Sequence, residues 1–106
     1  MGDYILVMAT ASSMEEGERI AKAVVGEGLA ACCNIVPEIR SIYTWKGEVC
    51  DEREVMLIMK SRADLFTALK ERVRELHSYE VPEVISFTIE SGLDEYLAWI
   101  GSVTKG

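Results

Sequence analysis

The chain has 106 residues, of which 49% are hydrophobic and 27% are charged, and its formal net charge is −7. This length suffices for one hydrophobic core, so we expect a single domain over residues 1–106. The acidic balance argues against nucleic-acid binding, because that affinity comes mainly from Lys and Arg side chains that neutralise phosphates.

The N-terminal part of the chain predicts a strand followed by a helix. Residues 4–10 form an apolar run of strand length. Ser13 and Glu16 then form a capping box, in which Ser13 accepts from the amide three residues on and Glu16 reaches back. Apolar residues continue at helical spacing to Val24, and the glycines within residues 26–28 are expected to end the helix.

The middle of the chain predicts an unusually long β-hairpin. Its first arm covers residues 29–36, bends near Pro37 and resumes over residues 39–45, and its second arm covers residues 48–60. The Lys46-Gly47 dipeptide predicts a tight turn, since glycine tolerates a positive φ. Each arm is far longer than the usual strand of ~5–6 residues. We therefore expect the end of the hairpin to project beyond the sheet.

The C-terminal part predicts a helix, a strand and a final short helix. The helix begins near Ser61 and ends near His77, before Pro82, and the strand covers residues 84–90. Apolar residues at helical spacing over 93–100 mark the last helix. The order β-α-β-β-α-β plus a C-terminal helix predicts an α+β protein of the ferredoxin-like split βαβ type, with two helices on one face of an antiparallel sheet.

Two of the predicted strands carry apolar side chains on both faces. In residues 5–9 and 55–59 every position is apolar, although two helices cover only one face of such a sheet. Each apolar side chain left in water forgoes ~1.5–3 kcal/mol of burial free energy. Tyr43 and Trp45 near the hairpin tip are of the type that anchors interfaces. We therefore expect a closed cyclic oligomer of identical chains.

His77 is the only histidine and lies where the second predicted helix ends. A neutral imidazole there would bind a divalent metal, and Glu80 and Glu83 follow closely enough to supply carboxylates. The alternative is that His77 caps the last carbonyls of the helix. The spacing alone leaves both interpretations open.

The three cysteines form no metal or redox motif, because no C-x-x-C pair occurs. Cys32 and Cys33 are adjacent on a strand and point to opposite faces, and each is interpreted as a small buried hydrophobe. Cys50 lies in a polar stretch and is expected to be exposed. Three thiols cannot all pair within one chain, and residues 5–9 are too short for a signal peptide or membrane span. We expect a cytoplasmic protein without membrane contact.

The sequence contains no nucleophile or phosphate-binding motif. Neither a G-x-S-x-G turn nor a Gly-rich phosphate loop is present, so we do not expect an enzyme. Lys60 lies near the end of the hairpin, where it would bind a small anion or pair with a carboxylate such as Glu54.

Four short motifs and two single residues occur along the chain in an order that is typical of one protein family. They are LAAC at 29–32, SIYTWKG at 41–47, Glu54, Lys60, HSYEVPE at 77–83 and YLAWI at 96–100. Together they resemble the CutA divalent-cation tolerance family, and the resemblance covers essentially the whole chain.

The resemblance implies a ferredoxin-like protomer in a tight homotrimer, cytoplasmic and linked to tolerance of copper and other divalent cations. A copper or zinc ion is expected as a possible, not an obligatory, ligand. The implied intersubunit cleft is lined by Tyr43, Lys60 and Tyr79, and the implied metal ligands are His77, Glu80, Glu83 and Cys32. Trp45, Glu54 and Trp99 are implied at the trimer interface.

The chain departs from the family pattern at three positions. Ser78 replaces the proline of the usual His-Pro-Tyr turn, which makes a less rigid loop. Ala9 and Leu76 stand where some members carry a Cys and a second His, so soft-metal affinity is expected to fall. Two other functions stay open: a P-II-like signalling module that binds a small anion through Lys60, and a non-catalytic scaffold for a protein partner.

Overall fold

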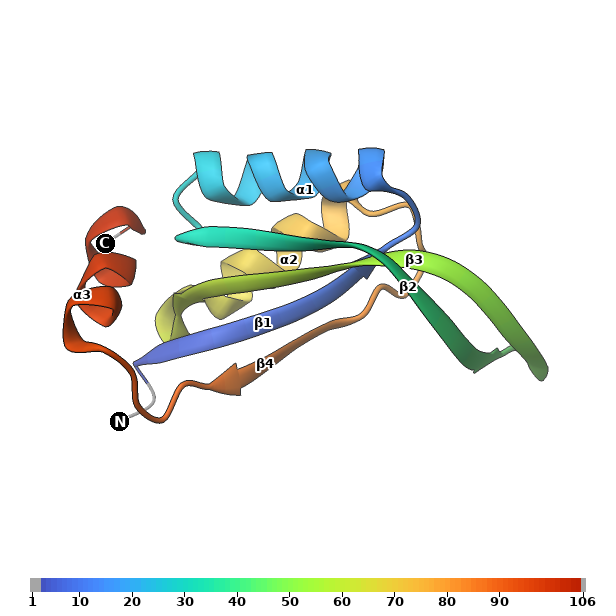
Figure 1. Ribbon diagram of the computed structural model, residues 1–106. Coiled ribbons are helices and arrows are strands. Elements are labelled where there is room, and N and C mark those ends of the chain that lie inside the picture. Colours follow the sequence, from blue (N-terminus) through green and yellow to red (C-terminus); the bar gives the residue numbers. More distant parts are fainter. Residues whose placement is uncertain (1–2, 106) are drawn as a thin grey trace.

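The chain forms a four-stranded antiparallel sheet with two helices on one face and a third helix at one end (Figure 1). The computed structural model describes residues 3–105, so residues 1, 2 and 106 of the predicted domain lie outside the described part. The elements are β1 (Tyr4–Ala11), α1 (Met14–Gly26), β2 (Cys32–Trp45), β3 (Glu48–Arg62), a 3₁₀ turn (Ala63–Leu65), α2 (Phe66–Leu76), β4 (Val84–Thr88) and α3 (Asp94–Val103). The strands lie in the order β2-β3-β1-β4. The predicted α+β class and element order are confirmed.

Helix α1 begins as its sequence predicts. The Ser13 hydroxyl accepts a hydrogen bond from the Glu16 amide at 3.1 Å. The Glu16 side chain reaches back to the amide of Ser12 rather than to that of Ser13. Gly17 lets the helix approach the sheet closely, since a Cβ there would lie 2.9 Å from a methyl of Val55. The helix ends before Gly28, whose φ of +75° favours glycine.

The core lies between the sheet and the two helices α1 and α2. Ile20 and Val24 of α1, and Leu69 and Val73 of α2, are fully buried against β1 and β3. The buried positions alternate along each strand, with Ile5, Val7 and Ala9 on β1 and Val55, Leu57 and Met59 on β3. The alternating apolar residues of the strands therefore pack against the apolar residues that recur at helical spacing in α1 and α2, and together they form one core.

The long hairpin projects beyond this core. Strand β1 pairs with β3 only from Val55 onward, so within the described chain residues 38–54, here called the hairpin arm, pair only with one another. A register shift between Val36 and Ile39 bends the arm away from the sheet, as Pro37 predicts. Lys46 and Gly47 have φ of 52° and 82° and close a tight turn. The arm extends the molecule along its longest dimension, which measures 44 Å (Figure 1).

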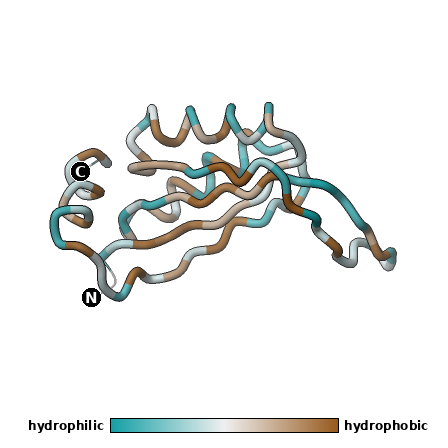
Figure 2. Tube along the Cα trace, in the orientation of Figure 1, coloured by the Kyte–Doolittle hydropathy of each residue, from teal (hydrophilic) through white to brown (hydrophobic). Residues whose placement is uncertain are grey.

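The sheet face opposite α1 and α2 carries apolar side chains, as predicted. This bare face consists of alternate residues on the three strands that pair side by side, namely Leu6, Met8, Met56, Ile58, Ile85 and Phe87. Phe87 is 52% exposed. Apolar residues recur along the strands in Figure 2. Helix α3 lies at one end of the sheet, where Tyr96 contacts Cys32 and Ile100 is buried (Figure 1).

Candidate functional site

A pocket of about 820 Å³ lies between the hairpin arm and the loop of residues 77–83. The loop leaves α2 in an extended conformation at His77 and returns to the sheet at β4. Six of the predicted site residues line the pocket: Tyr43, Trp45, Glu54, Tyr79, Glu80 and Glu83. The structure therefore brings together the central part of the predicted site.

The pocket is acidic. Glu54, Glu80 and Glu83 contribute carboxylates, and Arg40 is the basic side chain that lines it. The Arg40 guanidinium forms a bidentate ion pair with Asp51, at 2.9 and 2.7 Å, which lowers the pKa of the Asp51 carboxyl. Arg40 is thus paired with Asp51 and not with any of the three pocket carboxylates. The site is therefore better suited to a cation than to an anion.

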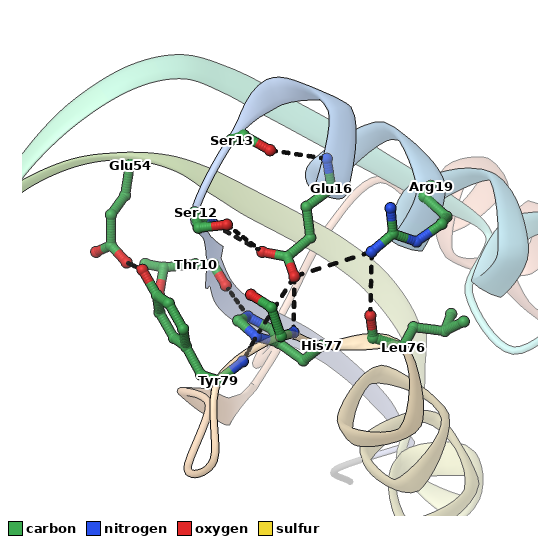
Figure 3. Close-up of polar contacts among 10 residues, drawn as sticks. Thr10, Ser12, Ser13, Glu16, Arg19, Glu54, Leu76, His77 and Tyr79 are labelled. Atoms are coloured by element: carbon green, nitrogen blue, oxygen red, sulfur yellow. Dashed lines mark hydrogen bonds and ion pairs between the residues drawn. The ribbon is translucent and has the colours of Figure 1, made fainter.

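Tyr79 connects the loop to the hairpin arm. Its hydroxyl donates to the Glu54 carboxylate at 2.6 Å, and Glu54 is only 6% exposed (Figure 3). Burial and the adjacent Glu54 carboxylate raise the pKa of the Tyr79 phenol well above its ordinary value. The phenol therefore stays protonated and serves as the hydrogen-bond donor that Glu54 needs.

His77 is buried, and both of its ring nitrogens are engaged. Nδ1 accepts from the Tyr79 amide at 3.0 Å, so the proton resides on Nε2, which donates to the Thr10 carbonyl at 2.6 Å. The ring also packs on Tyr79, with centroids 4.7 Å apart. In this chain His77 therefore fastens the loop to β1 instead of offering a free lone pair to a metal. The backbone N–H of His77, rather than its ring, caps the last turn of α2 by donating to the Arg74 carbonyl at 3.4 Å.

Glu16 lies beneath the same loop and is 4% exposed. Its carboxylate accepts from the amide and hydroxyl of Ser12, both at 2.8 Å, and from the Ser78 amide at 2.7 Å (Figure 3). Burial alone would raise the pKa of the Glu16 carboxyl, but these hydrogen bonds outweigh it and lower the pKa to about 2. Sequence reasoning assigned Glu16 to the helix cap and missed its contact with a loop 62 residues away.

Cys32 and Lys60 lie at the other end of the sheet, away from this pocket. They are opposite each other on β2 and β3. The Cys32 sulfur lies 3.8 Å from the Tyr96 hydroxyl, and the Lys60 ammonium donates to the Asn34 side chain. Trp99 packs near Tyr96 on α3. Lys60 therefore does not pair with Glu54. Within one chain the predicted cleft residues form two separate groups, one at the pocket and one at the opposite end of the sheet.

The predicted metal set is not assembled within one chain. Among residues 3–105, no three His, Cys, Asp or Glu side chains lie close enough together to hold a metal ion. Cys33 is half-buried, and burial raises the pKa of its thiol to about 11, which disfavours the thiolate that binds metal. Cys50 is half-buried opposite Tyr43 rather than exposed. The described part of one chain therefore does not assemble a complete set of protein ligands at the pocket.

The family described as CutA1 divalent ion tolerance protein matches residues 5–103. The divalent-cation tolerance protein CutA of Thermus thermophilus is 48% identical over 95 residues, which cover 90% of this chain and 92% of that protein. The crystal structure of CutA1 from Oryza sativa superposes with a TM-score of 0.95 at 44% identity, covering 97% of this chain and 94% of that one. The chain belongs to the CutA1 divalent ion tolerance family.

The relatives differ in length and in named location. The chloroplastic protein CutA of Arabidopsis thaliana is 45% identical over 101 residues, which are 95% of this chain but only 56% of that protein. The matching family and the Thermus thermophilus protein are both named for tolerance of divalent cations. Within residues 3–105, no helix is both long and apolar enough to cross a membrane.

Proposed function

We propose that this chain supports divalent-cation tolerance by binding a divalent cation at the acidic pocket, which neighbouring copies complete in a homotrimer. The observation that carries the proposal is the gathering of Glu54, Glu80 and Glu83 beside an Arg40 already paired with Asp51. Carboxylate and water ligands suit hard and borderline divalent cations, and copper(II) binds most tightly among the first-row divalent ions.

The trimer is proposed because two apolar surfaces lack cover in a single chain. Both the bare face and the apolar residues of the hairpin arm, such as Ile42 at 65% exposure, face solvent within the described part of the chain. A ring of identical chains would cover both surfaces and supply the missing cation ligands. The number three rests on the family resemblance. The proposed cytoplasmic location rests on three free thiols.

The anion-binding alternative has less support. Lys60, its expected ligand, is bonded to Asn34 and lies away from the pocket. The pocket itself offers Arg40, which Asp51 neutralises. No observation singles out a protein partner for the scaffold alternative.

Calorimetric titration with Cu²⁺ and Zn²⁺ tests the proposal. The reference protein is Cys50→Ser, which removes a thiol that would bind copper adventitiously. We expect saturable binding that the double variant Glu80→Gln/Glu83→Gln weakens by about tenfold or more. The matched control Glu48→Gln/Glu90→Gln changes two exposed carboxylates outside the pocket and should bind like the reference. Absence of binding, or equal binding by the two double variants, would refute the proposal.

A further inference from the structure

We propose that Glu16 is the positioning residue of the pocket: its buried carboxylate holds the 77–83 loop in place through the Ser78 amide, and thereby places Tyr79 and Glu80. The importance of this placement for cation binding rests on the function proposed above. The anchoring of the loop itself can be tested independently.

The carboxylate of Glu16 bridges two segments that are distant in sequence. Oε1 accepts two hydrogen bonds from Ser12 at the start of α1, while Oε2 accepts the amide of Ser78 (Figure 3). Only an ionised carboxylate presents acceptors on both sides, because a Gln side chain has one oxygen and one NH₂ donor. A glutamine at position 16 must therefore lose one of the two attachments.

Ser78, whose amide is anchored, lies directly before Tyr79 and Glu80, which line the pocket. His77 and Tyr79 flank Ser78, and their side chains fasten the loop to Thr10 of β1 and Glu54 of the arm. The loop is thus held at three points, of which Glu16 is the one on the helix layer (Figure 3). Releasing the Ser78 amide would free the segment that carries Tyr79 and Glu80.

This anchor depends on the amide N–H of Ser78. A proline at position 78 would have no N–H to donate to the Glu16 carboxylate. Serine leaves the backbone at this position freer than proline would, and the Glu16 hydrogen bond restricts it again. His77 is already extended, with φ −83° and ψ 144°, which is the backbone conformation that a residue before proline requires.

A pure helix-capping role would not require the loop contact. Ser13 already caps the Glu16 amide, and Glu15 places a second carboxylate in the first turn of α1. Glu15 is exposed, so Glu15→Gln changes the charge at the helix start without touching the loop. It is the matched control for Glu16→Gln.

The test combines amide hydrogen exchange with the Cu²⁺ and Zn²⁺ titrations, all in the Cys50→Ser protein. In Glu16→Gln we expect the Ser78 and Tyr79 amides to exchange at least about tenfold faster, with core amides such as that of Leu57 unchanged. Cation affinity should fall by about tenfold, and Glu15→Gln should change neither quantity.

A double-mutant cycle separates positioning from general stability. In the Ser78→Pro background, Glu16→Gln should lower cation affinity by less than about twofold, because the proline ring replaces the anchor. An equal loss in both backgrounds, or faster exchange throughout the core, would overturn the inference. If the reference protein binds no cation, the function proposed above fails, and the exchange of the Ser78 amide alone decides the inference.

Discussion

The base of the molecule and the hairpin arm place the same kind of side chain in opposite surroundings. Ile20 of α1 is fully buried between helix and sheet, whereas Ile42 of the arm is 65% exposed. Two helices cover one face of the base, but no helix within residues 3–105 covers the arm, which is a two-stranded ribbon (Figure 1). Two strands alone are at best marginally stable in water. The core of the base is therefore buried within one chain, whereas the apolar side chains of the arm and of the bare face are not.

Polar contacts follow the same division. Glu16 in the base is buried and fully hydrogen-bonded, whereas the Arg40–Asp51 pair of the arm has side chains that are 72% and 47% exposed. The pocket lies where the two regions meet, because Glu54 belongs to the arm and Tyr79 to the loop beside the base. The shape of the candidate site thus depends on how firmly the arm and the base are joined.

The largest expected effect compares two isoleucines. Ile20→Ala leaves a cavity in the core and should lower the free energy of unfolding by about 2–5 kcal/mol. Ile42→Ala should change the unfolding of the chain itself by less than about 0.5 kcal/mol and should instead weaken association between chains. Urea unfolding and sedimentation at several protein concentrations measure both. Similar losses of folding free energy would mean that the arm belongs to the core.

The next effect concerns pH. The pKa of Glu16 falls from its ordinary 4.5 to about 2 on folding, so its stabilisation is complete above pH ~4.5 and is lost as the pH falls towards 2. Between pH 6 and pH 3 this loss amounts to roughly 2 kcal/mol.

Urea unfolding of Glu16→Gln beside Glu15→Gln isolates this contribution. Arg19 and His77 also face the Glu16 carboxylate, both at 3.9 Å, and are present in both variants. We expect a shallower dependence of stability on pH in Glu16→Gln than in Glu15→Gln. Equal slopes would contradict the assigned role of the buried carboxylate.

A smaller effect is expected where the arm meets the base. Tyr79→Phe removes the hydroxyl donor to Glu54, a nearly buried carboxylate, and should cost about 1–3 kcal/mol of unfolding free energy. Adding Glu54→Gln removes the unpaired charge and should recover part of this loss. Thermal or urea unfolding measures the cycle, and additive losses would show that the two side chains do not interact.

The smallest effect lies within the arm. Asp51→Asn breaks the exposed ion pair with Arg40 and should cost less than about 1 kcal/mol, because water and salt screen such pairs. Urea unfolding at low and at high salt provides the check. A loss of several kcal/mol that persists in salt would mean that the pair is buried in the assembled protein.

Most of the fold could be predicted from local patterns. The bend at Pro37, the Lys46-Gly47 turn and the start of α1 each depend on a few adjacent residues whose backbone preferences are strong. The apolar alternation also identified a face that the helices leave bare. These features are local, so their physical causes are visible in the sequence.

The site was harder to predict because it depends on contacts between distant segments. Nothing near Glu16 in the sequence indicates that its second oxygen meets Ser78, or that both nitrogens of His77 are engaged. The pairing of β2 with β3 likewise places Cys32 and Lys60 at the far end of the sheet from the pocket. Register and loop packing, rather than residue type, decide these positions.

In the proposed function, one chain is incomplete, and identical copies cover its arm and bare face. Sedimentation equilibrium at micromolar protein concentration tests it most directly. The account predicts a single species of three times the 11.8 kDa chain mass, which the Ile42→Ala variant shifts towards dissociation. A stable species with the mass of one chain at every concentration would contradict it.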